Sequence, residues 1–169
     1  MSIERALQSV RLLRDSVREK NPPPEEGAPS PEEPVIYFSL VRNTRGYLER
    51  LVHQINGSYE HGWYDASAVM IRRLVETLII EVYEKYGLAD SIKTAQGDFF
   101  YLRDLISALS TQKQWNLSKN AKAALPRLKD VGDMSAHSRR FIAQRQDIDR
   151  MMADLRVIVQ ELMTLASLK

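Results

Sequence analysis

The sequence of 169 residues contains no cysteine. This absence excludes disulfides, iron–sulfur clusters, thiolate zinc sites and cysteine nucleophiles, and it favours a cytoplasmic location. No apolar run approaches the roughly 20 residues that a membrane helix needs, and the charged start, Met-Ser-Ile-Glu-Arg, is unlike a signal peptide. The seven glycines form no phosphate-binding loop or dinucleotide fingerprint. We therefore predict no membrane segment and no cofactor.

Histidine is also scarce. His53, His61 and His137 are the three histidines, and no two of them lie three or four residues apart on a helix, as in helical zinc motifs. No carboxylate cluster completes a ligand set around them, so we predict no metal site. Nothing resembles the strained turn that carries a catalytic serine.

Proline divides the chain into three parts. Residues 21–34 hold six of the seven prolines together with four glutamates. Because proline fixes φ and lacks an amide donor, this segment is predicted to be an extended linker of roughly 40 Å. It separates residues 1–20 from a body over residues 35–169.

Residues 1–20 have the pattern of an amphipathic helix. Its apolar stripe is formed by residues at helical spacing: Ile3, Leu7, Val10, Leu13 and Val17. Such a stripe needs a cover, which the body, a second subunit or a foreign protein would provide. A membrane surface ranks last, because the stripe lacks aromatic anchors.

The body has helical periodicity throughout, and no alternating strand pattern occurs, so the fold class is all-α. One helix is predicted to begin near Leu40 and to stop at Asn56-Gly57. The next, over about residues 64–86, is apolar nearly all round and is predicted to be the central helix of a bundle, ended by Gly87.

Three further helices are predicted after this one. The first begins at Gly97-Asp98 with Asp98 as its cap. The second is capped by Ser118, and Pro126 either kinks it or starts a second piece. The third is a long helix that starts near Asp147 and carries a heptad seam, suited to packing inside a bundle or across a dimer. The seam residues are Ile148, Met151, Leu155, Ile158, Leu162 and Leu165.

Aromatic residues lie beside predicted helix ends. Trp63, Tyr64 and Trp115 occupy such positions. We expect them to cover the core rather than to stack on nucleic-acid bases.

Positive charge is concentrated in residues 113–145. Eight basic residues against Asp130 and Asp133 give this segment a net charge of +6, whereas the whole chain carries +2. The basic residues are Lys113, Lys119, Lys122, Arg127, Lys129, Arg139, Arg140 and Arg145. Such a field attracts polyanions, although a merely solvated face is an equally good interpretation.

The sequence contains two distinctive motifs, which occupy Tyr64 to Glu76 and Leu128 to His137. The first reads YDASAVMIRRLVE and the second LKDVGDMSAH, about fifty residues later. Together they resemble a family of small HEPN-like helical domains, named for higher eukaryotes and prokaryotes nucleotide-binding. In that family an Arg-rich, Glu-containing core helix is followed by a Gly-Asn-x-x-Ala-His-type signature before the last helix. The resemblance covers roughly residues 40–168.

The resemblance implies a bundle of about four or five helices that often dimerises, with the signature near a cleft. In the catalytic ribonucleases of the family, an arginine precedes a histidine by a few residues, and no metal is used. The histidine helps to deprotonate the ribose 2′-hydroxyl while the arginine holds the phosphate. In this sequence Gly132 stands at the arginine position and Asp133 at the polar position that follows, while Arg139 and Arg140 follow His137.

An architectural interpretation accounts for the same residues. Gly132 is predicted to end a helix in a left-handed conformation, and Asp133 to cap the next turn. His137 is predicted to pack or to hydrogen-bond across the junction. A buried ionic network holding this junction is predicted for a second group of residues: Arg72, Arg73 and Glu76.

The sequence thus favours a non-catalytic HEPN-like binding module that forms a homodimer. Its ligand would be RNA or DNA, bound through basic residues of the 113–145 segment: Lys119, Lys122, Arg127, Lys129, Arg139 and Arg140. One alternative is a metal-independent ribonuclease of the toxin or phage-defence type, with His137, Arg139 and Arg140 as catalytic residues. Another is a structural dimerisation unit whose N-terminal helix binds a protein partner.

Overall fold

The computed structural model of the protein describes residues 3–20 and 33–169, which are mostly helical and contain no β-strand. An isolated antiparallel bridge joins Lys93 to Phe99. The all-α prediction is therefore confirmed. The helices are α1 (Ile3–Lys20), α2 (Gly46–Glu60), α3 (Tyr64–Lys85), α4 (Leu102–Thr111), α5 (Lys119–His137), α6 (Arg145–Asp149) and α7 (Met152–Leu165), with short 3-10 helices η1 (Phe38–Leu40) and η2 (Ala89–Ile92).

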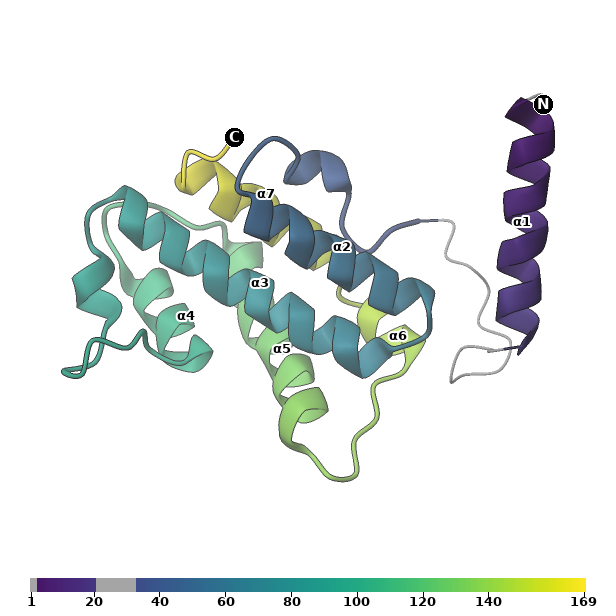
Figure 1. The fold of residues 1–169 in the computed structure, drawn as a ribbon. Helices are drawn as coiled ribbons and strands as arrows, with labels where there is room; N and C mark the ends of the chain where they lie inside the picture. The colour runs from purple at the N-terminus through teal and green to yellow at the C-terminus, as the bar shows by residue number, and fades with distance from the viewer. Residues whose placement is uncertain (1–2, 21–32) are drawn as a thin grey trace.

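Helix α3 is the centre of the body. Helices α2, α4, α5, α6 and α7 all pack against it (Figure 1). The helix ends as its sequence predicts: Gly87 adopts a φ of 67°, its amide donates to the Glu84 carbonyl, and the Leu88 amide donates to the Tyr83 carbonyl at 2.8 Å. These are the two hydrogen bonds of a Schellman motif, which only a left-handed residue such as glycine permits without strain.

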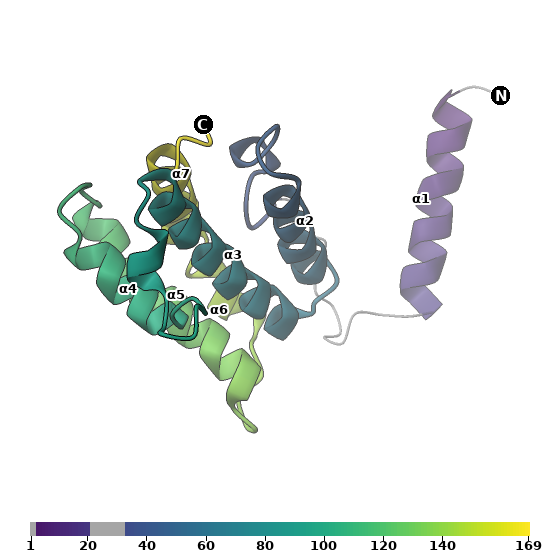
Figure 2. The same ribbon diagram turned by 60° about the vertical axis from the view of Figure 1, so that its left-hand side comes forward.

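Helix α1 lies apart from the other helices in both views (Figures 1 and 2). Its apolar residues Ile3, Leu7, Val10 and Leu13 are 55–80% exposed. What covers this stripe stays a prediction. The linker predicted over residues 21–34 lies outside the described residues, except for Glu33 and Pro34.

The segment that follows this gap is fixed to the body by two side chains. Val35 and Ile36 are completely buried. Arg156 of α7 donates to the Val35 carbonyl at 3.0 Å and to the Glu33 carboxylate at 2.7 Å. Asn56 of α2 accepts from the Ile36 amide and donates to the Ile36 carbonyl, at 3.0 and 2.8 Å. The core of the body therefore includes residues well before α2.

The predicted stop of the first body helix is wrong. Asn56 and Gly57 lie inside α2, which runs from Gly46 to Glu60. Asn56 is used there for the side-chain contact to Ile36 rather than for a turn. The chain reverses instead at Gly62, whose φ is 75°.

The predicted start of the following helix is also wrong. Asp98 does not cap a helix, because α4 begins only at Leu102. Residues 93–99 form a tight reversal in which Gly97 has a φ of 93° and the Thr94 amide donates to the Asp98 carbonyl at 2.7 Å. Glycine and aspartate therefore mark a loop here, as they do in many turns.

Helix α5 is continuous, which excludes one of the two alternatives predicted for Pro126 and corrects the prediction for Gly132 and Asp133. Ser118 caps it as predicted, since its hydroxyl accepts from the Ala121 amide at 3.1 Å. Pro126 neither starts a second helix nor divides this one, because it sits on the exposed face, where water can bind the carbonyl that the missing amide leaves free. Gly132 and Asp133 do not form a helix end and a cap, because both lie within the helix.

The long C-terminal helix is divided in two. A capping box between Gln144 and Asp147 starts α6, and α7 begins at Met152 after a short break. Most of the heptad seam is buried inside this single chain: Ile148, Met151, Leu155, Ile158 and Leu162. The seam therefore packs within the bundle and is not available as a dimer interface.

Candidate functional site

The second motif meets the first where α5 crosses α3. Gly132 is buried there, and a Cβ placed on it would lie 2.7 Å from the Cβ of Arg72 and 3.1 Å from the Ala68 carbonyl oxygen. Real Cβ atoms do not approach so closely, so Gly132 is the residue that lets the two helices touch. Its role is close packing rather than backbone conformation.

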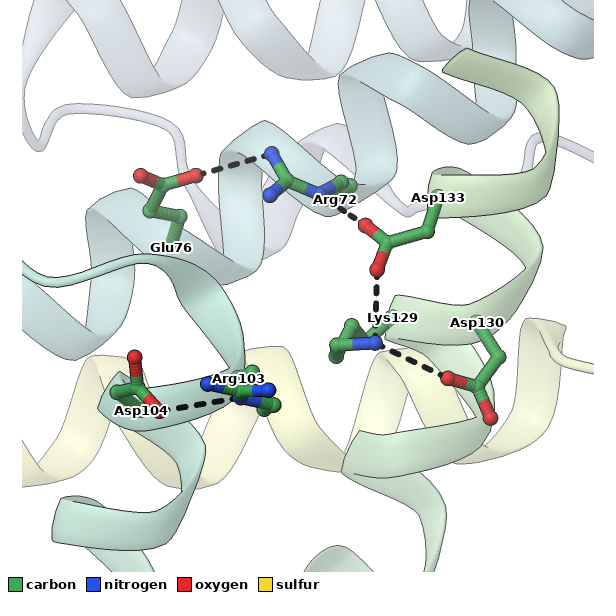
Figure 3. A network of polar contacts seen from close by, with 7 residues as sticks. All are labelled: Arg72, Glu76, Arg103, Asp104, Lys129, Asp130 and Asp133. Carbon is green, nitrogen blue, oxygen red and sulfur yellow. Dashed lines mark hydrogen bonds and ion pairs between the residues drawn. The ribbon is translucent and has the colours of Figure 1, made fainter. Parts of the chain in front are cut away.

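A chain of charged side chains surrounds this crossing (Figure 3). Arg72 donates from Nε to Asp133 at 2.7 Å and lies 3.3 Å from Glu76 through Nη1. Asp133 also accepts from Lys129 at 2.7 Å, and Lys129 reaches Asp130 at 3.1 Å. Positive and negative side chains alternate along this network, which runs from Glu76 to Asp130. Each residue between these two ends therefore has a counter-ion on both sides.

The pKa values of the central pair are shifted toward the charged forms. Burial acts to raise the pKa of the Asp133 carboxyl, but the hydrogen bonds from Lys129 and Arg72 outweigh it and hold that pKa below its usual value. The hydrogen bond to Asp133 raises the pKa of Lys129. The Asp133–Lys129 pair is therefore ionised across the ordinary pH range, which suits a structural junction and not a proton-transfer site.

Arg73 lies outside this network. Its side chain is exposed, and it makes no ion pair within the described part of the chain. Helical geometry explains the difference, because adjacent residues point about 100° apart and only Arg72 faces α5.

His137 is the last residue of α5 and is exposed. Among the described residues its imidazole has no hydrogen-bond or ion-pair partner, so the predicted packing across the junction is wrong. Arg139 and Arg140 follow in an exposed loop, which the Ser138 hydroxyl orders by accepting from the amides of Arg140 and Phe141 at 3.4 and 3.2 Å. The structure thus brings these three candidate residues to one exposed end of α5, and this end begins about one and a half turns after the Gly132–Arg72 contact.

The basic residues of the 113–145 segment do not form one uniform surface. Three of them are paired with carboxylates: Arg127 with Asp154 at 2.7 Å, Lys129 within the network, and Arg145 with Asp149 at 3.5 Å. The other five have no carboxylate partner in the described ranges: Lys113, Lys119, Lys122, Arg139 and Arg140. These five residues form two groups. The first group, Lys113, Lys119 and Lys122, lies before α5 and in its first turn, and the second group, Arg139 and Arg140, lies just after its last residue.

A cavity of about 300 Å³ lies beside the first group, between α4 and α5. Lys122 and Lys129 border it, with Arg103, Ser107 and Ser110 of α4 opposite them. Arg103 lies 3.1 Å from Asp104, and Lys129 is bound to Asp133. Among the described residues, Lys122 is therefore the cation at this cavity that has no carboxylate partner.

Trp63 is an exposed aromatic residue that sequence reasoning assigned to the core. Tyr64 and Trp115 are buried as expected, at 3% and 7% exposure, but Trp63 is 52% exposed. Gly62, one residue earlier, is the signal that could have found it, because a glycine in a left-handed turn directs the next residue out of the preceding helix.

The described residues offer no site for a metal ion formed by three or more histidine, aspartate or glutamate side chains. Within the same ranges, no helix is both long enough and apolar enough to cross a bilayer.

Comparison with known protein families gives a match over most of the body. The sequence model of a family described as "Domain of unknown function (DUF4145)" matches residues 53–169. Neither the curated proteins nor the solved structures contain a significant match. The matched region begins inside α2 and contains both motifs and the whole Arg72–Asp133 network.

Proposed function

The chain belongs to the DUF4145 family, whose function is unknown, and from this premise we propose that it is a cytosolic, non-catalytic, HEPN-like module that binds RNA or DNA. The order of its elements supports the HEPN-like part of the proposal. The helix with Arg72 and Glu76 precedes the helix with Gly132 and His137, and the last helices follow.

One observation carries the nucleic-acid part of the proposal. Lys119 and Lys122 at the start of α5, and Arg139 and Arg140 beyond its end, have no carboxylate partner among the described residues. A helix of 19 residues separates the two groups by roughly 27 Å, at about 1.5 Å per residue. Cations without a carboxylate partner along such a length favour an extended polyanion.

The proposal that the module does not cleave nucleic acid rests on the positions of its arginines. The ribonucleases of the resembling family need a guanidinium beside the histidine, and Gly132 occupies that position here. Arg72 of the core helix is held by Asp133 and Glu76 at the helix crossing. Its guanidinium is thus already bound by two carboxylates, which opposes phosphate binding by this arginine.

Binding to labelled RNA and DNA over a salt series tests the proposal. The variants K119A/K122A and R139A/R140A each remove two unneutralised cations, and R42A/R50A removes two exposed arginines elsewhere as a control of equal charge. Each lost phosphate contact lowers the slope of log K against log salt by about 0.7 for single strands and 0.9 for duplex DNA. We expect both test variants, but not the control, to reduce the slope. Absence of binding by the wild type at low salt refutes the proposal.

A second candidate function is a metal-independent ribonuclease. It is favoured by the exposure of His137 next to Arg139 and Arg140, where a ribose could reach the imidazole. Cleavage of RNA in the presence of a chelator, abolished in H137A with the fold retained, establishes it. Intact RNA with both proteins excludes it.

We further propose that the module is a homodimer whose interface lies outside the buried α6–α7 seam. The exposed apolar stripe of α1 supports a protein-binding role for this helix, toward the second subunit or a separate protein. Light scattering of the full chain gives the mass. A monomer at all accessible concentrations refutes the dimer.

A further inference from the structure

Trp63 is held in a fixed, outward orientation at the turn between α2 and α3. The Trp63 amide donates to the Ser58 carbonyl at 2.8 Å, and the Gly62 amide donates to the Tyr59 carbonyl at 3.1 Å. The backbone that carries the indole is therefore fixed by the end of α2, while 52% of the residue remains exposed. Trp63 therefore presents a large aromatic surface to solvent from a rigid turn, where another ring could stack on it.

His61 stacks on this indole. The two ring centroids lie 5.1 Å apart, and the ring planes are inclined by 27°. The His61 Nδ1 lies 2.7 Å from the Gly57 carbonyl oxygen, which fixes the imidazole in turn. The indole is thus ordered before any ligand arrives, so a second ring can stack on it at little cost in side-chain entropy.

A hydrogen bond joins the start of α3, next to this aromatic pair, to the end of the basic loop that follows α5. The Asp65 carboxylate, in the first turn of α3, accepts from the Ala143 amide at 2.9 Å. Trp63 is two residues from Asp65, and Arg140 is three residues from Ala143. At no more than about 3.6 Å per residue, the Arg140 Cα lies within roughly 11 Å of the Ala143 Cα.

We infer that Trp63, together with Arg139 and Arg140, forms a binding site for single-stranded nucleic acid. An unpaired base would stack on the indole, and the two arginines would bind phosphates of the same strand. Base–aromatic stacking depends on an accessible face of the base, which a continuous duplex does not offer because both faces of each base are already stacked. This inference rests on the proposed function and adds to it the residue that selects single strands.

The two tryptophans of the chain allow a direct test. Trp115 is buried, at 7% exposure, and packs on Tyr83 and Tyr86, so only Trp63 is accessible to a base. Addition of a short single-stranded oligonucleotide is expected to quench the intrinsic fluorescence of the wild type. The same oligonucleotide is expected to cause no quenching in W63F, in which Trp115 is the remaining fluorophore.

Affinity provides the second readout. W63A is expected to weaken binding of the single strand by about tenfold to a hundredfold and to leave binding of a duplex of the same sequence unchanged. Y101A removes another aromatic residue, 80% exposed at the start of α4, and is the matched control with no expected effect. Circular dichroism confirms that each variant is folded.

The failures of the two proposals are distinguishable. If the wild type binds nucleic acid but W63A binds the single strand as tightly, or if the strand causes no quenching, the stacking site is refuted and the proposed function stands. If the wild type binds neither strand nor duplex at low salt, both are refuted.

Discussion

Gly132 of α5 and Arg72 of α3 lie in contact, so that a Cβ on Gly132 would come within 2.7 Å of the Arg72 Cβ. The same Arg72 donates to Asp133, the next residue of α5. Gly132 thus permits the close approach of α5 to α3. Asp133, its neighbour, fixes the side chain of Arg72 at the point of contact. The two motifs meet to build a helix crossing.

Replacement of Gly132 by alanine tests this packing. Alanine normally stabilises a helix interior by about 0.5–1 kcal/mol relative to glycine, but here the new methyl group must displace the Arg72 stem or the α3 backbone. We expect G132A to be destabilised by about 1–3 kcal/mol, as in overpacked cores, measured by chemical denaturation.

Gly57 provides the matched control for this substitution. It lies inside α2, and a Cβ on it would meet no atom within 4 Å. G57A should therefore be stabilised by about 0.5–1 kcal/mol. If G132A is stabilised like G57A, the close-packing role of Gly132 is wrong.

The Asp133–Lys129 pair predicts a particular dependence of stability on pH. Because the folded-state pKa of Asp133 is lowered, its contribution is present above the unfolded value of about 3.9 and is lost as the pH falls through the folded value. Because the pKa of Lys129 is raised, its contribution is present below about 10.4 and is lost as the pH rises through the folded value.

Substitution of Asp133 by asparagine should therefore flatten the loss of stability in acid and cost about 1.5 kcal/mol at neutral pH, as for a hydrogen bond to a charged group. D130N removes the same charge from a side chain that is 65% exposed and should cost less. Thermal melts over a pH series measure both effects. Identical pH profiles for D133N and the wild type would falsify the role given to this pair.

The fold class and the central helix were predictable from the sequence, whereas the local roles of several residues were not. The apolar periodicity of residues 64–86 identifies α3, because burial on all sides leaves a signal along the chain itself. Gly132 illustrates the limit: glycine serves turns and close packing equally well, and only the position of Arg72 on another helix distinguishes them. Asn56 was assigned to a turn for the same reason, since its contact with Ile36 is distant in sequence.

The candidate site was predictable only in part. The sequence assigned Arg72 to an ionic network at the junction of the two motifs, but it did not indicate that Asp133 binds Arg72 from within a helix. The charge of the 113–145 segment was visible, whereas its neutralisation at Arg127 depends on Asp154 of a later helix. Trp63 was missed because its exposure follows from the Gly62 turn and not from any periodicity.

His137 should be dispensable for folding. Its side chain is exposed and has no partner among the described residues, so H137A should melt within about 1 °C of the wild type, as expected for a surface substitution. Differential scanning calorimetry provides the comparison. A loss of several degrees would restore the packing role that the sequence suggested.

Arg156 should be needed to hold the start of the body. It donates to the Val35 and Pro34 carbonyls and to Glu33, and its guanidinium lies 4.2 Å from the centre of the Tyr37 ring. We expect R156A to lower the melting temperature and to increase proteolysis near residue 35. R150A, an exposed arginine at the α6–α7 break, is the control. Equal protease sensitivity of the two variants would contradict this anchoring role.

The central claim is that the chain binds nucleic acid through its unneutralised cations and does not cleave it. The most direct measurement is binding of a labelled single-stranded RNA by the wild type and by R139A/R140A between about 50 and 200 mM salt, with the RNA then recovered on a denaturing gel. The account predicts salt-dependent binding by the wild type, a salt slope reduced by about 1.4 in the variant if both phosphate contacts are lost, and intact RNA throughout. No binding by the wild type at the lowest salt concentration, or RNA shortened by the wild type, would contradict it.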